Sequence, residues 1–161
     1  MLKDPNIKVL DTRNNYEIKI GTFRNSMPVN ITKFREFPSK VKSLRFNKKD
    51  KIVMFCTGGI RCEKASTLMN KKGFKNVFQL KGGILNYLRY KKNTNQTDMW
   101  DGECFVFDNR VSVNKKLKKG SYLQCHGCRS PITKIETSSK LYKKGVHCEN
   151  CYHSRSSEQK K

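Results

Sequence analysis

The strongest constraint on the fold is a segment in which an apolar run, a glycine turn and a helical pattern follow one another. Residues 51–55 form a continuous apolar run of the kind found in buried strands, and residues 62–72 carry apolar side chains at helical spacing. Cys56-Thr57-Gly58-Gly59-Ile60-Arg61 lies between them. Strands joined through short turns to helices are typical of α/β proteins with parallel sheets.

The rest of the first half repeats this alternation. Gly73 can end the helix as a C-cap, and Gly82-Gly83 precedes a second helical pattern. We therefore expect an α/β domain with a parallel sheet flanked by helices. Its further strands are expected at residues 8–11, 27–30 and 76–80, and its second helix at residues 84–90.

Four regions are expected along the chain. The α/β domain should occupy residues 1–95, and the polar residues 91–98 at its end should form a linker. A connecting segment, residues 96–124, contains a hairpin strand at residues 104–107 that turns at Asp108-Asn109. A four-cysteine metal module at residues 125–153 and a basic, frayed tail at residues 154–161 follow.

Cys56 stands where a reactive thiolate can be stabilised. The two glycines allow the backbone to turn successive N–H groups inward, and the following helix adds the positive end of its dipole. Arg61 adds a full positive charge. Such surroundings lower a thiol pKa and favour the nucleophilic form. The alternative is a buried structural cysteine at the end of a strand.

The second cysteine pattern indicates a metal site. Cys125 and Cys128 form one Cys-x-x-Cys pair, and Cys148 and Cys151 form another. Two such turns can close a tetrahedral four-thiolate site, which usually holds structural Zn²⁺. Two disulfides, a redox pair and an iron–sulfur cluster are the alternatives.

The charge balance points to a polyanionic partner. The chain has 35 Lys and Arg against 13 Asp and Glu, a formal net charge of +22. Nucleic acid is the natural partner of such a surface, and Tyr122, Tyr142 and Tyr152 lie among basic residues where rings can stack on bases. A lysine-rich composition from an A+T-rich genome is the alternative. No apolar stretch suits a membrane span, and the N-terminus has no apolar core that would suggest export.

The six-residue loop from Cys56 to Arg61 resembles the active-site loop of rhodanese domains, in which the cysteine carries a persulfide. Related Cdc25-type phosphatases have one more residue between cysteine and arginine. Residues 11–17, Asp-Thr-Arg-Asn-Asn-Tyr-Glu, followed by Gly21-Thr22-Phe23, are similar to the early rhodanese signature. Residues 56–66, Gly82-Gly83-Ile84, residues 102–108 and the downstream cysteine pairs resemble the tRNA uridine hydroxylase family of rhodanese-related proteins.

This resemblance implies an oxidoreductase of bacterial tRNA modification, which uses molecular oxygen to form 5-hydroxyuridine at the wobble position. The tRNA anticodon region is then the partner, and the bacterial cytoplasm is the implied location. Family members carry a further N-terminal α/β domain, which we expect this chain to lack and a separate polypeptide to supply. A rhodanese-type sulfurtransferase working through a Cys56 persulfide and an inactive, truncated RNA-binding remnant are the alternatives.

The resemblance and the loop chemistry together assign the site residues. Cys56 is expected to be the essential nucleophile and Arg61 an anion stabiliser. Cys62 can act as a resolving thiol or can simply face the core, and Cys104 is expected to be a small buried apolar side chain. The anion cradle is expected to comprise Thr57, Gly58, Gly59 and Ile60, and the metal ligands Cys125, Cys128, Cys148 and Cys151.

Overall fold

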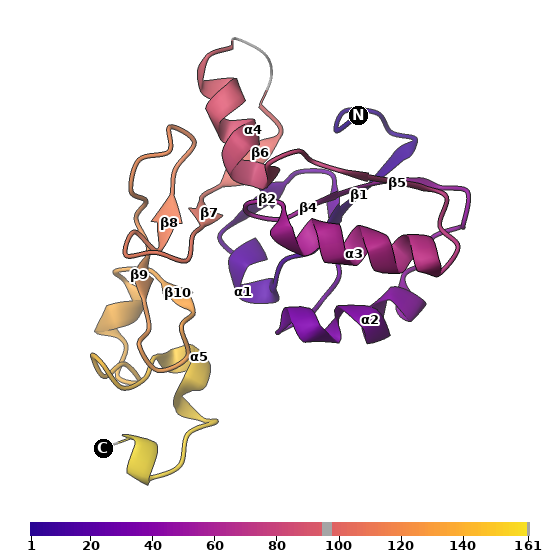
Figure 1. Cartoon of the computed structure of the whole chain (residues 1–161). Coiled ribbons are helices and arrows are strands. Elements are labelled where there is room, and N and C mark those ends of the chain that lie inside the picture. Colours follow the sequence, from indigo (N-terminus) through magenta and orange to yellow (C-terminus); the bar gives the residue numbers. More distant parts are fainter. Residues whose placement is uncertain (95–97, 161) are drawn as a thin grey trace.

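A four-stranded parallel sheet forms the centre of the first half of the chain (Figure 1). The structure is a computed structural model that describes residues 1–94 and 98–160. The strand order is β3-β1-β4-β5, and every neighbouring pair runs parallel. The strands are β1 (Ile7–Asp11), β3 (Ser26–Pro28), β4 (Lys51–Phe55) and β5 (Asn76–Gln79).

The central position of β4 in the sheet accounts for its apolar sequence. β4 pairs with β1 on one side and β5 on the other, and both of its faces are covered. A strand in this position needs a continuous apolar run, and Ile52, Val53, Met54 and Phe55 are all buried. Because β4 is central, the residue that follows it, Cys56, emerges in the middle of the sheet edge.

Helices lie on both faces of the sheet. Figure 1 shows α2 and α3 on the same face of the sheet. One apolar cluster lies between these helices and the sheet, and it includes Leu10, Ile52, Met54, Phe37 of α2 and Met69 of α3. The opposite face is covered by a second cluster that includes residues of α4 and Trp100. The helices are α1 (Asn15–Ile18), α2 (Phe37–Lys40), α3 (Ile60–Lys71), α4 (Gly83–Lys92) and α5 (Glu149–Tyr152), with 3-10 turns at Phe34–Glu36, Val41–Ser43, Glu136–Ser138 and Glu158–Lys160.

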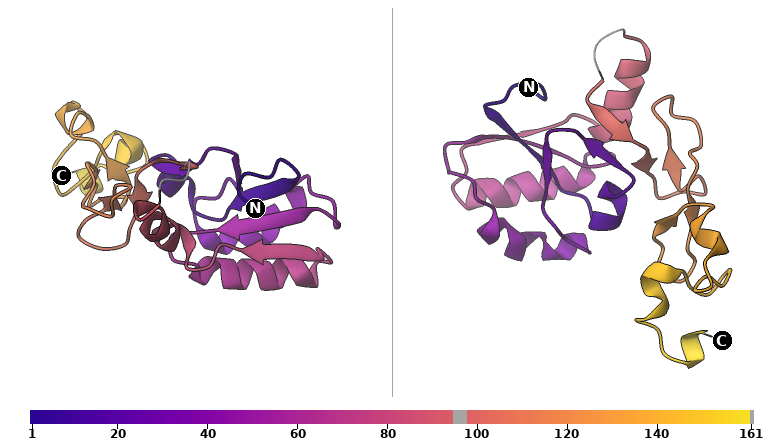
Figure 2. Two further views of the ribbon diagram at one scale, coloured as in Figure 1. Left: turned by 90° about the horizontal axis from the view of Figure 1, so that it is seen from above. Right: turned by 180° about the vertical axis from the view of Figure 1, so that it is seen from behind.

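The second half of the chain is built from short antiparallel pairs. The first of these pairs connects the second half to the sheet domain, because β6 in the second half pairs with β2 in the first half. Both views in Figure 2 place the C-terminal residues beside the sheet domain, not over a face of the sheet. The pairs are β2 (Gly21–Phe23) with β6 (Trp100–Gly102), β7 (Cys104–Phe105) with β8 (Ser112–Val113), and β9 (Leu123–Gln124) with β10 (Pro131–Ile132).

The expected α/β class is confirmed, and the differences concern element ends. The strand expected at residues 27–30 is the short edge strand β3, and α4 continues to Lys92, into the expected linker. Residues 95–97 of that linker and Lys161 lie outside the described residues. The tail expected to fray forms a 3-10 turn at Glu158–Lys160, where Lys160 Nζ lies 4.3 Å from the centroid of the Tyr152 ring.

Across residues 1–94 and 98–160, no helix combines the length and the apolar character needed to cross a membrane.

A fully buried ion pair joins the first strand to its surroundings. Arg13 Nη2 lies 2.7 Å from Asp11 Oδ2, and both side chains are fully buried. Arg13 Nη2 also donates to the Gly21 carbonyl at 2.7 Å, and Thr22 Oγ1 donates to Asp11 Oδ2 at 2.8 Å. The guanidinium carbon lies 5.3 Å from the centroid of the Trp100 ring. The pair therefore connects β1, β2 and β6.

The chain contains a matched pair of Asp-x-Arg ion pairs that tests this role. Asp11→Ala should lower the free energy of unfolding by roughly 3–5 kcal/mol, because Arg13 stays buried without its counterion. Asp108→Ala breaks the exposed Asp108–Arg110 pair and should leave stability nearly unchanged, because solvent screens that pair. Urea unfolding followed by circular dichroism measures both. Equal losses would contradict the assigned role of the buried pair.

Candidate active site and metal centre

The Cys56 loop folds its backbone around the sulfur. Gly59 is the N-cap of α3, with φ of 99°, a conformation that favours glycine. Its N–H donates to Cys56 Sγ at 3.1 Å. Cys56 itself is 2% exposed. The loop thus supplies a backbone donor and a helix N-terminus to a sulfur shielded from water.

These surroundings favour the thiolate of Cys56. A hydrogen bond from the Cys62 thiol, N–H donors from Cys62 and Gly59, and the Arg61 charge lower the pKa of Cys56 to about 5, against the effect of burial. The hydrogen bond to Cys56 and burial raise the pKa of Cys62, which stays protonated as the donor. Thr12 Oγ1 also lies within hydrogen-bonding distance of Cys62 Sγ, at 3.6 Å.

A second glycine turn supports the loop from outside. Ile84 N–H donates to the Cys56 carbonyl at 3.0 Å, and Leu85 N–H donates to the Thr57 carbonyl at 3.1 Å. Gly83 has φ of 63°, and a Cβ there would collide with the carbonyl oxygens of Cys56 and Thr57. The Gly82-Gly83 turn is therefore part of the site, because only glycine lets α4 begin against the Cys56 loop.

Arg61 is held by a carboxylate. Its Nη1 and Nη2 donate to Glu17 Oε2 and Oε1 at 2.6 and 2.7 Å, a two-pronged geometry that fixes the guanidinium plane. Glu17 is fully buried on α1, and hydrogen bonding to this carboxylate raises the pKa of Arg61 against desolvation. Thr57 Oγ1 lies 3.4 Å from Glu17 Oε1. Glu17 therefore links α1, the Cys56 loop and α3.

Glu17 is a site residue that the sequence analysis did not single out. Its carboxylate also accepts from the Asn14 N–H at 3.1 Å, as the glutamate of an Asn-x-x-Glu helix start does. That spacing is visible in the sequence, but it indicates only a helix start. The meeting of Glu17 with Arg61 depends on tertiary structure, since 44 positions separate them.

The remaining predicted loop residues differ in exposure. Gly58 faces open space, because a Cβ there would meet nothing within 4 Å. Ile60 is 73% exposed, and Phe107 of the β7–β8 turn is 69% exposed and lies with its ring centroid 5.6 Å from the Arg61 guanidinium carbon. Cys104 is fully buried, as expected for a small apolar side chain.

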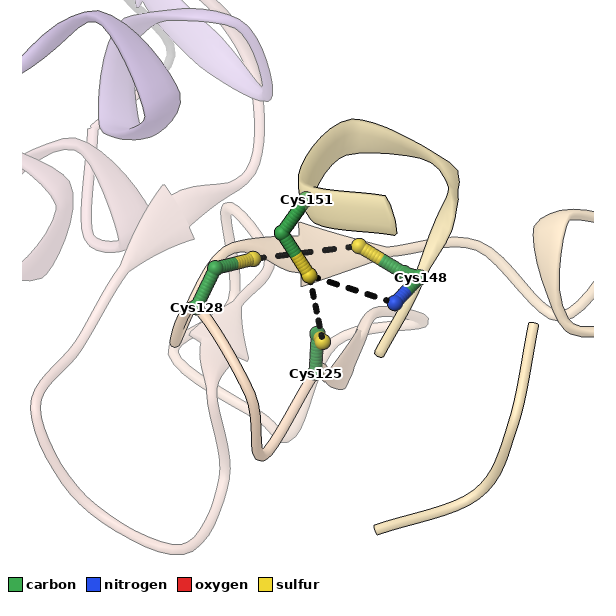
Figure 3. Close-up of side chains that lie close together, drawn as sticks. All are labelled: Cys125, Cys128, Cys148 and Cys151. Atoms are coloured by element: carbon green, nitrogen blue, oxygen red, sulfur yellow. Dashed lines mark hydrogen bonds between the residues drawn. The ribbon is translucent and has the colours of Figure 1, made fainter. Parts of the chain in front are cut away.

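The four remaining cysteines come together in the second half of the chain (Figure 3). Their four sulfurs all lie within 4.8 Å of one another, and none is in a disulfide. The Sγ atoms of Cys125 and Cys151 are 3.9 Å apart, and those of Cys128 and Cys148 are 3.8 Å apart. Tetrahedral zinc with bonds of about 2.3 Å requires sulfurs about 3.8 Å apart, so these residues can hold a metal ion.

The module around the four clustered cysteines has almost no core of its own. Its buried cluster consists of three of the cysteines and Ile132, with Cys128 and Tyr142 packed against it. A segment that buries so few apolar side chains needs a staple, which a bound metal supplies. His147 is buried, with Nδ1 3.0 Å from the Leu141 carbonyl oxygen, and is not one of the four clustered ligands.

Comparison with known proteins identifies relatives of the chain. The profile of the family described as Rhodanese-like domain matches residues 1–90. A tRNA uridine(34) hydroxylase of Teredinibacter turnerae is 51% identical over 161 residues, covering 99% of this chain and 50% of that protein. The chain thus spans about half the length of this curated relative.

Solved structures with rhodanese-like domains are also similar. The crystal structure of such a domain from Anabaena sp. is 23% identical, with a TM-score of 0.45, over 52% of this chain and 92% of that one. A rhodanese-related protein from Thermoplasma volcanium is 27% identical, with a TM-score of 0.46, over 53% of this chain and 79% of that one.

The thiolate assignment predicts the pH dependence of alkylation. Cys56 should react with iodoacetamide at a rate whose midpoint lies near pH 5, rising above that pH as the thiolate forms. Cys62→Ala removes the hydrogen-bond donor and should move the midpoint upward, towards the ordinary value of about 8.5.

Mass spectrometry of tryptic peptides can follow each site, because cleavage after Arg61 separates Cys56 from Cys62. Cys104, whose pKa is raised by burial to about 12, is the internal control and should stay unmodified. A wild-type midpoint near pH 8.5 would show that the loop does not stabilise the thiolate.

Proposed function

This chain belongs to the rhodanese-like domain family, and from that premise we propose that it hydroxylates the wobble uridine of tRNA to 5-hydroxyuridine through Cys56. The observation that carries the proposal is the 51% identity to a tRNA uridine(34) hydroxylase over 99% of this chain. The poised Cys56 thiolate and the basic composition support it, because the reaction needs a reactive group and a polyanionic substrate. The protein would then act in the cytoplasm, where tRNA is modified.

Each loop residue has a proposed role. Cys56 is the nucleophile, and the backbone of Thr57, Gly58, Gly59 and Ile60 forms the anion cradle. Arg61 stabilises negative charge in this cradle, and Glu17 positions Arg61, because both guanidinium ends are bound to that carboxylate. Cys62 acts first as the hydrogen-bond donor to Cys56 and is placed to serve as its resolving thiol.

Access to the sulfur limits the chemistry. Cys56 is 2% exposed, so a uracil ring must enter past the exposed loop residues Gly58 and Ile60, or an atom bound to the sulfur must project outward. The net change replaces the C5–H bond of uracil with C5–OH, for which we propose molecular oxygen as co-substrate. One oxygen atom enters the ring, and the other leaves as water with two electrons and two protons from a thiol reductant, which becomes a disulfide. Addition of the thiolate to C6 would make C5 electron-rich; once C5 carries the hydroxyl, release of the C5 proton and the thiolate would restore the ring.

We propose Zn²⁺ as the ion of the four-cysteine centre, in a structural role. Four thiolates at tetrahedral spacing leave no open coordination position for substrate, which is the pattern of structural zinc sites. The ion would organise residues 125–153 as a module attached to the domain at residues 1–95 by the connecting segment 96–124.

A rhodanese-type sulfurtransferase is the second candidate. The burial of Cys56 favours it, because the outer sulfur of a persulfide would extend beyond the thiolate towards the loop opening. Turnover of thiosulfate with cyanide that depends on Cys56 would support this function.

The proposed hydroxylation predicts a product that can be measured directly. In a strain lacking wobble 5-hydroxyuridine, this chain should restore the nucleoside, and Cys56→Ser should not, since serine cannot supply a thiolate. Nucleoside mass spectrometry of total tRNA is the readout, and Cys104→Ala is the matched cysteine control.

Because the relative is about twice as long as the shared region, the assay should be repeated with the unmatched half of that relative co-expressed. Product from the Cys56→Ser variant would rule out the proposed nucleophile. Thiosulfate turnover by a folded chain that forms no 5-hydroxyuridine in either arm would favour the sulfurtransferase.

The metal centre predicts a second outcome. The purified chain should contain one equivalent of zinc by elemental mass spectrometry, and Cys128→Ser should lose it, because a three-thiolate site binds more weakly. The variant should also lose protease resistance within residues 125–153, while Cys104→Ala keeps both properties. Full zinc content in Cys128→Ser would contradict the four-thiolate assignment.

A further inference from the structure

A cleft lies between the rhodanese-like domain and the metal module. It has a volume of about 710 Å³ and is bordered by α1, the β7–β8 turn and the segment around Cys125 and Cys128. We propose that this cleft binds an unstacked base of single-stranded RNA beside the Cys56 loop; the proposal rests on the proposed function for its substrate class. Its aromatic walls are Tyr16, Phe105, Phe107, Tyr122 and Tyr142.

A row of aromatic rings leads from the cleft to the active-site arginine. The ring centroids of Tyr16 and Phe105 are 5.2 Å apart, and those of Phe105 and Phe107 are 5.1 Å apart, both edge to face. The Phe107 ring then lies 5.6 Å from the Arg61 guanidinium carbon. The cleft and the Cys56 loop are therefore neighbouring parts of one surface.

Phe107 is the ring best placed to meet a base. It is 69% exposed, so most of the side chain is accessible to a ligand. Nucleotide bases stack on exposed aromatic rings in single-stranded RNA sites, and this contact is tolerant of sequence. Phe105, fully buried beside it, supports the ring from the protein side.

The turn that carries Phe107 is held in a strained conformation. Val111 has φ of 67°, an unusual backbone angle for a β-branched residue. Hydrogen bonds from Val106 N–H to the Val111 carbonyl, at 2.9 Å, and from Val111 N–H to the Asp108 carbonyl, at 3.0 Å, close the turn. Strain of this kind is retained where surrounding structure enforces it, often at binding sites.

The charge around the cleft suits a phosphate backbone. Lys119, Arg129 and Lys144 line it and are exposed, whereas its lining carboxylate, Asp108, is paired with Arg110 at 2.6 Å. Exposed cations beside exposed rings are the combination that binds single-stranded nucleic acid: the cations contact phosphates and the rings stack on bases. An anticodon loop presents both groups.

The geometry also couples the cleft to catalysis. Tyr16, on the cleft wall, immediately precedes Glu17, which holds Arg61. One short helix thus shapes the base-binding wall and the catalytic loop together. A base stacked on Phe107 would keep its neighbour in the RNA chain near the Cys56 loop.

A fluorescent hairpin tests the proposal with the full chain. The probe is an anticodon-type RNA hairpin with 2-aminopurine next to the wobble uridine, whose fluorescence falls when the base stacks on an aromatic ring. Phe107→Ala should weaken binding by roughly 10- to 100-fold and abolish the fluorescence change. Phe107→Tyr should keep both, because the ring remains. Tyr90→Ala removes a 57% exposed ring on α4, outside the cleft, and should change neither.

The cations are tested by salt dependence. Lys144→Gln should reduce the slope of log affinity against log salt by about 0.7, the effect of losing one phosphate contact to a single strand. Lys75→Gln is the control, because Lys75 is exposed just before β5, at the sheet edge opposite Cys56. Circular dichroism spectra of all variants establish that they fold.

The outcomes separate the cleft from the hydroxylase proposal. Three results would each overturn the proposal that the cleft binds RNA. These are equal binding by Phe107→Ala and Tyr90→Ala, a wild-type salt slope in Lys144→Gln, and no binding of the probe by the wild-type chain. Stacking at Phe107 by a chain that yields no 5-hydroxyuridine supports the cleft and counts against hydroxylation. If Phe107→Ala forms 5-hydroxyuridine normally and binds RNA as well as the wild type, the hydroxylase proposal stands and the RNA-binding role of the cleft is rejected.

Discussion

The contact between Glu17 and Arg61 is the interaction on which the arrangement of the site depends. A fully buried carboxylate needs a partner, and both guanidinium ends of Arg61 supply one at 2.6 and 2.7 Å. This contact joins α1 to the start of α3, so the Cys56 loop between β4 and α3 is held at both of its ends. Tyr16, which lines the cleft, immediately precedes Glu17 on α1.

The positive charge of Arg61 therefore acts on two groups, the Glu17 carboxylate and the Cys56 thiolate. Arg61 lies close enough to lower the pKa of Cys56, but its strongest contacts are with Glu17. Hydrogen bonds from Cys62 and from the loop backbone do more for the thiolate than the arginine does. The hydrogen bonds from Cys62 and the loop backbone therefore stabilise the thiolate, while Glu17 holds Arg61 in a fixed position.

The seven cysteines illustrate how surroundings decide the chemistry of one residue type. Cys56 lies among backbone N–H donors, which favour its thiolate. The thiol of Cys62 stays protonated and donates a hydrogen bond to Cys56. Cys104 lies in the core, where burial is the main cause that raises its pKa to about 12. The remaining four sulfurs lie within 4.8 Å of one another and so are ready to share an ion.

Local patterns predicted much of the fold and part of the site. The apolar run at residues 51–55, the glycine turns and the Cys-x-x-Cys spacing each act over a few residues, so β4, α3 and the cysteine cluster could be expected. The pairing of β2 with β6 and the contact of Glu17 with Arg61 could not, because they join residues far apart in the chain. The sequence pattern predicts Phe107 as the end of a hairpin strand, whereas β7 ends at Phe105 and Phe107 is 69% exposed in the turn that follows.

In the proposed function, the Cys56 loop and the cleft beside it receive one RNA strand. Photocrosslinking can test this arrangement, with an anticodon hairpin that carries 4-thiouridine at the wobble position and peptide mapping of the crosslinked protein. We expect crosslinks within residues 56–62 and 105–111, the two segments that meet at Arg61 and Phe107. Crosslinks confined to the lysine-rich segment at residues 40–51, with none near Cys56 or Phe107, would contradict the claim.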